Sequence, residues 1–241
     1  MTQIGRIMLR KLYDKLGSLN LGLWLMAGVT LLMGIGSFVT GPEETARLNS
    51  MPLIEWLTDV STSTGWWLWL TVALLAVLAL NTVLCSIESL RAKAGRSGLL
   101  LRLAPQVMHA GFLFIVLAHL VSSVGGFKEA LQVREGTVIS FPDGARIMVE
   151  RIDAEMGMRG YVTDFSATVA GTDGRRAVIR PNEPFFFHGV GLYLKQVEPF
   201  PVALGVVEIH REPGAGLALA GALLFTVGNV VVVTRRRQEK E

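Results

Sequence analysis

The chain has 241 residues, of which 51% are hydrophobic and only 18% are charged. This balance is too apolar for an ordinary soluble domain and indicates a membrane protein. The formal net charge of +3 arises from short basic clusters beside apolar stretches, so it gives no reason to expect a nucleic-acid partner.

Four uncharged stretches are each long enough to cross the roughly 30 Å of hydrocarbon in a bilayer. They are Leu16–Pro42, Ser61–Ile87, Leu103–Phe127 and Pro213–Thr234. We therefore predict three transmembrane helices at about 19–39, 65–86 and 104–125, and a fourth that begins near residue 213.

Basic residues cluster before the first stretch, between the second and third, and after the fourth. Positively charged flanks stay on the cytoplasmic side of the membrane. The three clusters therefore place both termini in the cytoplasm, with the lipid bilayer around the four helices. They comprise Arg6, Arg10, Lys11 and Lys15, then Arg91, Lys93, Arg96 and Arg102, then Arg235, Arg236, Arg237 and Lys240.

The segment 128–212 differs in kind, because turn signals separate short strand-like runs. Asp143-Gly144 and Asp173-Gly174 each suit a tight hairpin. The predicted strands are Ala130–Val133, Val138–Phe141, Arg146–Ile152, Phe165–Ala170, Arg176–Ile179, Leu192–Val197 and Val202–His210. The expected fold class is membrane α+β, with an extracytoplasmic all-β domain inserted between helices 3 and 4. Residues 1–127 form the first membrane part, and 213–241 form the fourth helix and a basic cytoplasmic tail.

Two helices carry features typical of packing or anchoring. The fourth is rich in glycine and alanine at its start, which lets another helix approach closely. That neighbour is either a helix of the same chain or a separate membrane subunit, and the sequence favours neither. In the second helix, Trp66, Trp67 and Trp69 are interpreted as anchors at the membrane interface.

His109 is the main candidate functional residue, because it lies within the third apolar stretch. A polar group in hydrocarbon costs several kcal/mol unless it finds a partner. Three explanations remain open from the residues alone: a haem ligand, a proton relay or an interhelical hydrogen bond. No pair of carboxylates suggests acid–base catalysis, so no catalytic residue is predicted.

The other three histidines are weaker candidates. His119 lies about 15 Å along the same helix from His109 and about 80° around it, so one iron cannot bind both. A hydrogen bond to Ser122 or Ser123 explains His119 equally well. His210, just before the fourth helix, is a candidate to receive haem iron or a propionate, or else is an ordinary interface residue. His188 is interpreted as a surface residue of a hairpin.

The order of these features resembles the ResB-like family of System II cytochrome c biogenesis membrane proteins. The resemblance covers nearly the whole chain. The segments that carry it are Leu16–Leu21 at the entry to helix one, Leu78–Ser86 at the exit of helix two, His109-Ala110-Gly111 in helix three, and Val133–Gly136, Pro181–Pro184 and Gly189–Gln196 in the outer segment.

This resemblance implies haem handling in the bacterial inner (cytoplasmic) membrane, with the β domain in the periplasm. It implies that His109 is a ligand to the metal of haem b, and it makes His119 and His210 further cofactor-binding candidates. The expected partners are a tryptophan-rich haem-handling membrane protein (ResC/CcsA-like) and apocytochrome c. Together they would relay haem across the membrane for attachment to the apocytochrome.

The chain also departs from a complete haem lyase. It lacks the tryptophan-rich outer segment of the partner protein, and its single cysteine, Cys85, cannot form an internal disulfide or a CxxC pair. We therefore expect no complete enzyme, but a possible subunit of a cytochrome c haem-lyase (synthetase) complex. The alternatives are a b-type haem electron-transfer subunit, or a structural or assembly subunit without haem.

Overall fold

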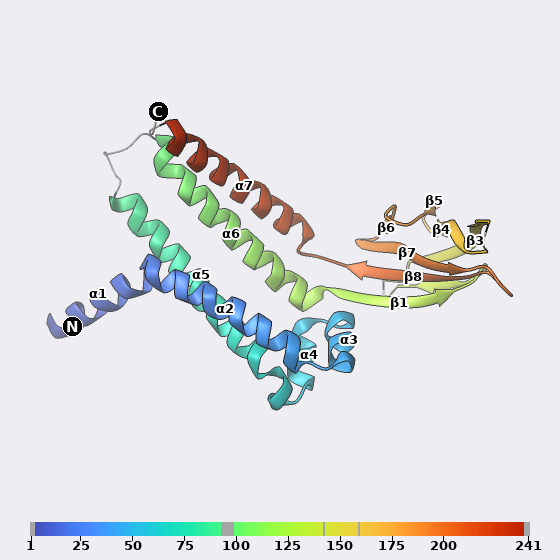
Figure 1. Cartoon of the computed structure of the whole chain (residues 1–241), viewed down its shortest axis with the longest axis horizontal. Coiled ribbons are helices and arrows are strands. Elements are labelled where there is room, and N and C mark those ends of the chain that lie inside the picture. The colour runs from blue at the N-terminus through green and yellow to red at the C-terminus, as the bar shows by residue number, and fades with distance from the viewer. Residues whose placement is uncertain (1–2, 93–98, 142, 159, 239–241) are drawn as a thin grey trace. The chain divides into compact units, whose positions relative to one another are not determined.

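The computed structural model describes residues 3–92, 99–141, 143–158 and 160–238 (Figure 1). Six helices precede the strands, and one follows them. The helices are α1 (Gln3–Leu16), α2 (Leu19–Val39), α3 (Pro42–Ser50), α4 (Leu53–Asp59), α5 (Thr62–Ala92), α6 (Leu99–Gly125) and α7 (Ala215–Gln238). The strands are β1 (Phe127–Val133), β2 (Val138–Ser140), β3 (Arg146–Met156), β4 (Val162–Gly171), β5 (Arg176–Ile179), β6 (Phe185–Phe187), β7 (Val190–Glu198) and β8 (Leu204–Arg211).

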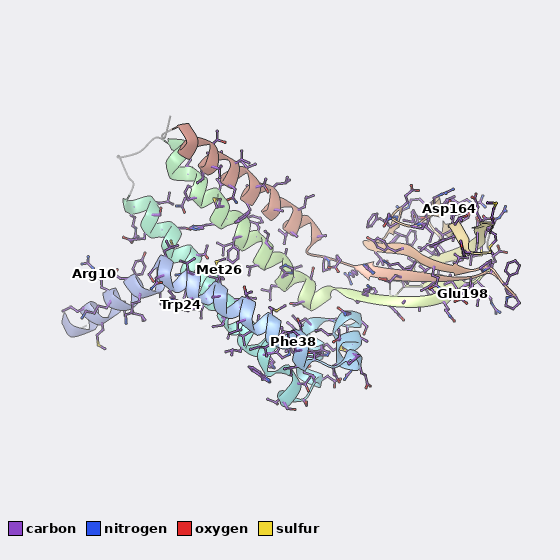
Figure 2. All side chains as sticks on the ribbon, in the orientation of Figure 1. Arg10, Trp24, Met26, Phe38, Asp164 and Glu198 are labelled. Carbon is purple, nitrogen blue, oxygen red and sulfur yellow. The ribbon has the colours of Figure 1, made fainter. Side chains whose placement is uncertain are left out.

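Four of the helices are long and apolar enough to cross a membrane, as predicted. The candidate spans are Leu19–Val39, Thr62–Arg91, Leu103–Gly125 and Ala215–Thr234. Large apolar side chains project away from the neighbouring helix, as Trp24 and Phe38 do on α2, where they are 72% and 92% exposed (Figure 2). Because apolar residues on this scale are unfavourable in water, these faces are suited to contact with lipid.

Helices α2 and α5 pack closely through glycines on α2. A Cβ atom on Gly36 would lie 2.4 Å from the ring of Trp67, so only glycine leaves room for the indole there. Trp67 is consequently 4% exposed, whereas Trp66 and Trp69 are 41% and 51% exposed. The prediction of three interface anchors is thus wrong for Trp67, which packs between helices. The sequence could not distinguish Trp67 from Trp66 and Trp69, because all three are tryptophans in the same apolar segment.

A buried amide joins α5 to the connection between α1 and α2. Asn81 is 4% exposed, and its Nδ2 donates hydrogen bonds to the carbonyl oxygens of Leu16 (2.6 Å) and Ser18 (3.0 Å). The Ser18 hydroxyl in turn accepts the backbone N–H of Leu21 and caps α2. Two carbonyls at the end of one helix and the start of the next are satisfied by one side chain.

Helices α6 and α7 lie side by side (Figure 1) and pack through three glycines spaced seven residues apart, Gly214 directly before α7 and Gly221 and Gly228 within it. A Cβ on Gly214 would meet the carbonyl of Ala118, and one on Gly228 would meet that of Ala104. In the centre, Gly221 of α7 faces Gly111 of α6. A Cβ on Gly221 would lie 2.7 Å from the carbonyl oxygen of Gly111, and a Cβ on Gly111 would lie 2.5 Å from the backbone nitrogen of Phe225. The small-residue face of the fourth helix is therefore occupied by α6 of the same chain.

The chain divides into two compact units. One unit (1–48, 53–124 and 214–241) contains the helices except for the last two residues of α3 and the last residue of α6, and the other contains residues 125–213 together with 49–52. The strands form two antiparallel four-stranded sheets: sheet A in the order β1-β8-β7-β6, and sheet B in the order β2-β3-β4-β5. Four membrane-length helices and β-sheets agree with the predicted α+β class, while the extracytoplasmic location stays a prediction.

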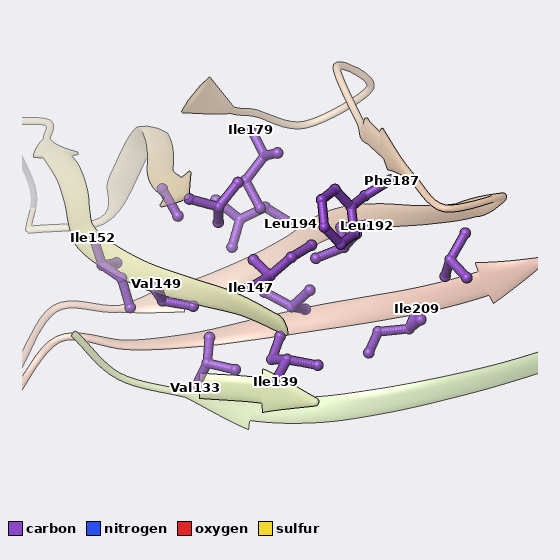
Figure 3. Close-up of a cluster of buried hydrophobic side chains, with 14 of the residues drawn as sticks. Val133, Ile139, Ile147, Val149, Ile152, Ile179, Phe187, Leu192, Leu194 and Ile209 are labelled. Atoms are coloured by element: carbon purple, nitrogen blue, oxygen red, sulfur yellow. The ribbon is translucent and has the colours of Figure 1, made fainter. Parts of the chain in front are cut away.

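Alternating side chains from both sheets build one hydrophobic core (Figure 3). Ile147 and Val149 of β3 are fully buried, as are Leu192 of β7 and Val207 of β8. The hairpins predicted at Asp143-Gly144 and Asp173-Gly174 are confirmed, with positive φ angles of 83° and 81° at their glycines. The sequence did not predict β6, because three successive phenylalanines show no alternation.

Candidate functional site

His109 lies on α6 and is partly buried, facing the end of α5. Its Nδ1 lies 2.7 Å from the Ser86 hydroxyl, which donates its own hydrogen to the carbonyl oxygen of Thr82 (2.8 Å). A hydroxyl has one hydrogen and a carbonyl can only accept, so both contacts are hydrogen bonds at once in the tautomer in which His109 donates from Nδ1 to Ser86. That tautomer carries the lone pair on Nε2, which can then bind iron.

A second polar side chain lies one helical turn before His109. The amide nitrogen and oxygen of Gln106 are both buried, and neither has a hydrogen-bond partner among the described residues. Positions i and i+3 share a face of a helix, so Gln106 and His109 lie on the same side of α6. A buried amide without partners is unfavourable by about 1–3 kcal/mol for each group, which makes Gln106 a candidate contact for a ligand or partner helix.

His119 lies on the same continuous helix but in different surroundings. It is exposed and forms no hydrogen bond within the part of the chain that the structure describes. The hydrogen bonds considered for it are absent there, because Ser122 accepts the N–H of Gly214 and Ser123 donates to Leu120. The helix therefore separates His119 from His109, as the spacing predicted, and leaves its imidazole without a described partner.

His210 belongs to β8, in the strand-containing unit. Its Nε2 lies 2.6 Å from a carboxylate oxygen of Glu208, and its ring packs 4.8 Å from that of Tyr193. Glu208 is 7% exposed and also pairs with Lys128 at 2.6 Å and Lys195 at 3.5 Å. Burial raises the pKa of Glu208, but Lys128 and His210 lower it more, to about 2. The carboxylate is therefore ionised, and only Nδ1 of His210 remains for another ligand.

His188 forms part of a feature that the sequence did not predict. It begins the two-residue turn between β6 and β7, with φ +49°, and its Nδ1 lies 2.9 Å from Asp143. The backbone N–H of Ala145 lowers the pKa of Asp143, and His188 lowers it further. These two side chains line a half-open cavity of about 170 Å³ with Phe127, Phe141, Val190 and Arg211. His188 is thus a hairpin residue, as predicted, but its side chain also contacts Asp143 in the hairpin between β2 and β3.

The three predicted histidines belong to two different elements of the fold. His109 and His119 lie on one helix, and His210 lies in the other unit. Ser86 and Gln106 are the contributors that sequence reasoning missed. Ser86 is 23 residues from His109, so only the pairing of α5 with α6 reveals it. Gln106 carried a weak signal, as an uncharged polar residue inside an apolar stretch.

The donor set at His109 fits a haem iron better than a bare metal ion. The described residues contain no group of three or more His, Cys, Asp or Glu side chains that could hold a metal ion. A single neutral imidazole suits haem, whose porphyrin supplies four nitrogen ligands and leaves only axial positions to proteins. The residues present therefore fit one axial ligand, which His109 would provide through Nε2.

The comparison with protein families agrees with the family suggested by the sequence. The model of the ResB-like family matches residues 89–204, a range that includes α6 with His109 and nearly all the strands. The solved structure "Cytochrome c Heme Lyase CcmF" is similar at 14% identity with a TM-score of 0.46, covering 87% of this chain and 34% of its own. This chain thus spans about a third of that protein. A comparison with curated proteins finds no match.

Proposed function

We propose that this ResB-like chain is a haem-binding component of a cytochrome c maturation complex. The observation that carries the proposal is the hydrogen-bond network at His109. Ser86 and Thr82 hold the imidazole with its proton on Nδ1, which leaves Nε2 as a ligand inside an apolar helix. Cytochrome c maturation is what the ResB-like resemblance implies, and the family match includes this helix.

In the proposed function, haem is cargo that passes through the membrane part of the chain. His109 supplies one axial ligand, and a histidine of a partner membrane protein supplies the other. Ser86 fixes the ring orientation and raises the basicity of Nε2, as outer-shell hydrogen bonds do for histidine ligands. Gln106, on the same face of α6, is available to hydrogen-bond to the cargo or to the partner helix.

The β domain is proposed to lie outside the cytoplasm, where apocytochrome c and the partner meet it. Both termini would then be cytoplasmic, in line with the three basic clusters. The chain would bind and orient haem, while thioether formation would need residues of the partner. His119 and His210 are proposed as secondary contacts for haem on its way outward.

The test is deletion of the gene in its host, followed by complementation. Haem-stained gels of membranes would measure c-type cytochromes, and difference spectra would measure b-type cytochromes in the same samples. We expect deletion to remove c-type cytochromes and leave b-type ones intact, wild type to restore them, and His109→Ala to fail. Ser123→Ala is the matched control, because it removes a polar side chain from the same helix at a position that is not a proposed haem contact.

Two results would contradict this proposal in favour of other functions. Normal c-type cytochromes in the deletion strain, together with a defect in quinol oxidation, would indicate an electron-transfer subunit. Full complementation by His109→Ala would remove this histidine from the function and favour a structural subunit.

A further inference from the structure

One face of sheet A gathers aromatic and charged side chains in the strand-containing unit. Val207 and Ile209 of β8 point into the core, so Glu208 and His210 point to the opposite face. The register places Lys128 of β1 directly across from His210. On the other side of β8, Tyr193 of β7 lies across from Glu208.

Three rings follow one another on this face. Phe186 meets Tyr193 edge-on at 6.4 Å, and Tyr193 packs against His210 at 4.8 Å. Gly191 lies across from both Phe186 and His210. A Cβ at position 191 would lie 2.8 Å from the Tyr193 ring and 3.1 Å from that of Phe186. Glycine therefore lets both rings close over the backbone of β7.

Two ammonium groups flank this surface and share a single carboxylate. Lys128 and Lys195 both reach Glu208, and the Lys195 ammonium also lies 5.7 Å from the centre of the Tyr193 ring. The lysine side chains are 46% and 49% exposed, so each can still meet a ligand. The two lysines together carry one positive charge in excess of this carboxylate.

We propose that this surface, the sheet A platform (Lys128, Phe186, Tyr193, Lys195, Glu208 and His210), binds a planar aromatic dicarboxylate of the porphyrin class. The exposed ring of Phe186 and the Tyr193–His210 pair offer stacking surface for a flat apolar ligand. Lys128 and Lys195 offer charge-assisted hydrogen bonds to its carboxylates. The inference rests on the proposed function in taking haem as the natural porphyrin, and it adds a receiving surface outside the membrane helices.

This mode of binding requires no iron, which separates it from the proposed ligation by His109. The platform recognises the ring and the carboxylates, so iron-free protoporphyrin IX should bind as haem does. The dimethyl ester of protoporphyrin keeps the ring but lacks the charges. It should therefore bind more weakly and respond little to the loss of the lysines.

The experiment uses the full chain in nanodiscs of neutral lipid, with empty nanodiscs as the blank. Fluorescence anisotropy would follow the titration of iron-free protoporphyrin IX and of its dimethyl ester. We expect Lys128→Gln with Lys195→Gln to weaken binding of the dicarboxylate about tenfold and to change ester binding less than twofold. Gly191→Val, which displaces the two rings but suits a strand, should weaken binding of both probes.

The matched control is Arg134→Gln with Arg146→Gln, which removes two charges from the same unit but leaves the platform intact. Circular dichroism checks that each variant folds, and Lys195→Gln alone serves if a double variant does not. Dicarboxylate binding no stronger than to empty nanodiscs, or an equal loss in the control, would overturn the proposal. The results of the two proposals can be told apart. Haem retained at His109 without binding of iron-free porphyrin contradicts only the platform.

Binding of iron-free porphyrin without haem at His109 supports the platform and contradicts only the proposed ligation by His109.

Discussion

The contact between Gly111 and Gly221 makes the packing of α6 against α7 testable by one methyl group. In Gly111→Ala, the new Cβ would lie 2.5 Å from the backbone nitrogen of Phe225 and 2.6 Å from the carbonyl oxygen of Gly221. To reach the 3.4 Å of an ordinary contact, the nitrogen must recede by about 0.9 Å, and backbone atoms cannot do so without moving the helix. Overpacking of this kind destabilises by about 1–3 kcal/mol.

Alanine also favours a helix over glycine by about 1 kcal/mol, so Gly111→Ala should be less stable than wild type by about 0–2 kcal/mol and less stable than a glycine-to-alanine change without a clash by about 1–3 kcal/mol. Gly34→Ala on α2 is the matched control, because no atom lies within 4 Å of its added Cβ. Unfolding by sodium dodecyl sulfate in mixed micelles, followed by circular dichroism, measures both variants. Equal or greater stability of Gly111→Ala than of Gly34→Ala would refute the close packing of α6 and α7.

Three further predictions concern single polar groups. Asn81→Ala should lower the free energy of unfolding by about 1–3 kcal/mol, because it leaves the Leu16 carbonyl without a donor and removes one of the two donors to the Ser18 carbonyl; a loss below 0.5 kcal/mol in the same micelle assay would contradict this. The pKa of Glu208 falls from 4.5 to about 2 on folding, so ionised Glu208 stabilises the folded state by at most about 3 kcal/mol. This contribution is present above pH 4.5 and is lost as the pH falls to 2. Thermal melts of Glu208→Gln should lack this part of the pH dependence, and an unchanged acid profile would refute it. Ser86→Ala should weaken haem binding at His109 about 10- to 100-fold in a spectral titration, whereas unchanged affinity would show that Ser86 does not position the ring.

The membrane helices could be predicted from sequence because hydropathy and span length act locally. The first span was predicted at 19–39, and α2 covers the same residues. The second was predicted at 65–86, but α5 extends over Thr62–Ala92. Apolarity ends with the hydrocarbon, whereas the hydrogen-bonded helix continues through the polar residues at both ends. The connection between the first two spans, where the sequence predicted no helix, forms α3 and α4, and Trp56 of α4 is fully buried.

The candidate site could be predicted only in part. His109 could be predicted because an imidazole in an apolar stretch is rare, and such a stretch can be recognised from the residues next to it. Its contact with Ser86 depends on how α5 and α6 pair. The sheet A platform likewise depends on strand register, which places Lys128 beside His210 although they are 82 positions apart. Such long-range pairings are set by tertiary packing and leave no local pattern.

The most direct test of the central claim is a reduced-minus-oxidised absorption spectrum of the purified protein with its membrane partner. Wild type, His109→Ala and Ser123→Ala would be compared at equal protein concentration, with total haem measured as the pyridine haemochrome. The account predicts b-type haem bands in wild type and Ser123→Ala, and their loss or strong reduction in His109→Ala. Full haem content in His109→Ala, or none in the wild type, would contradict it.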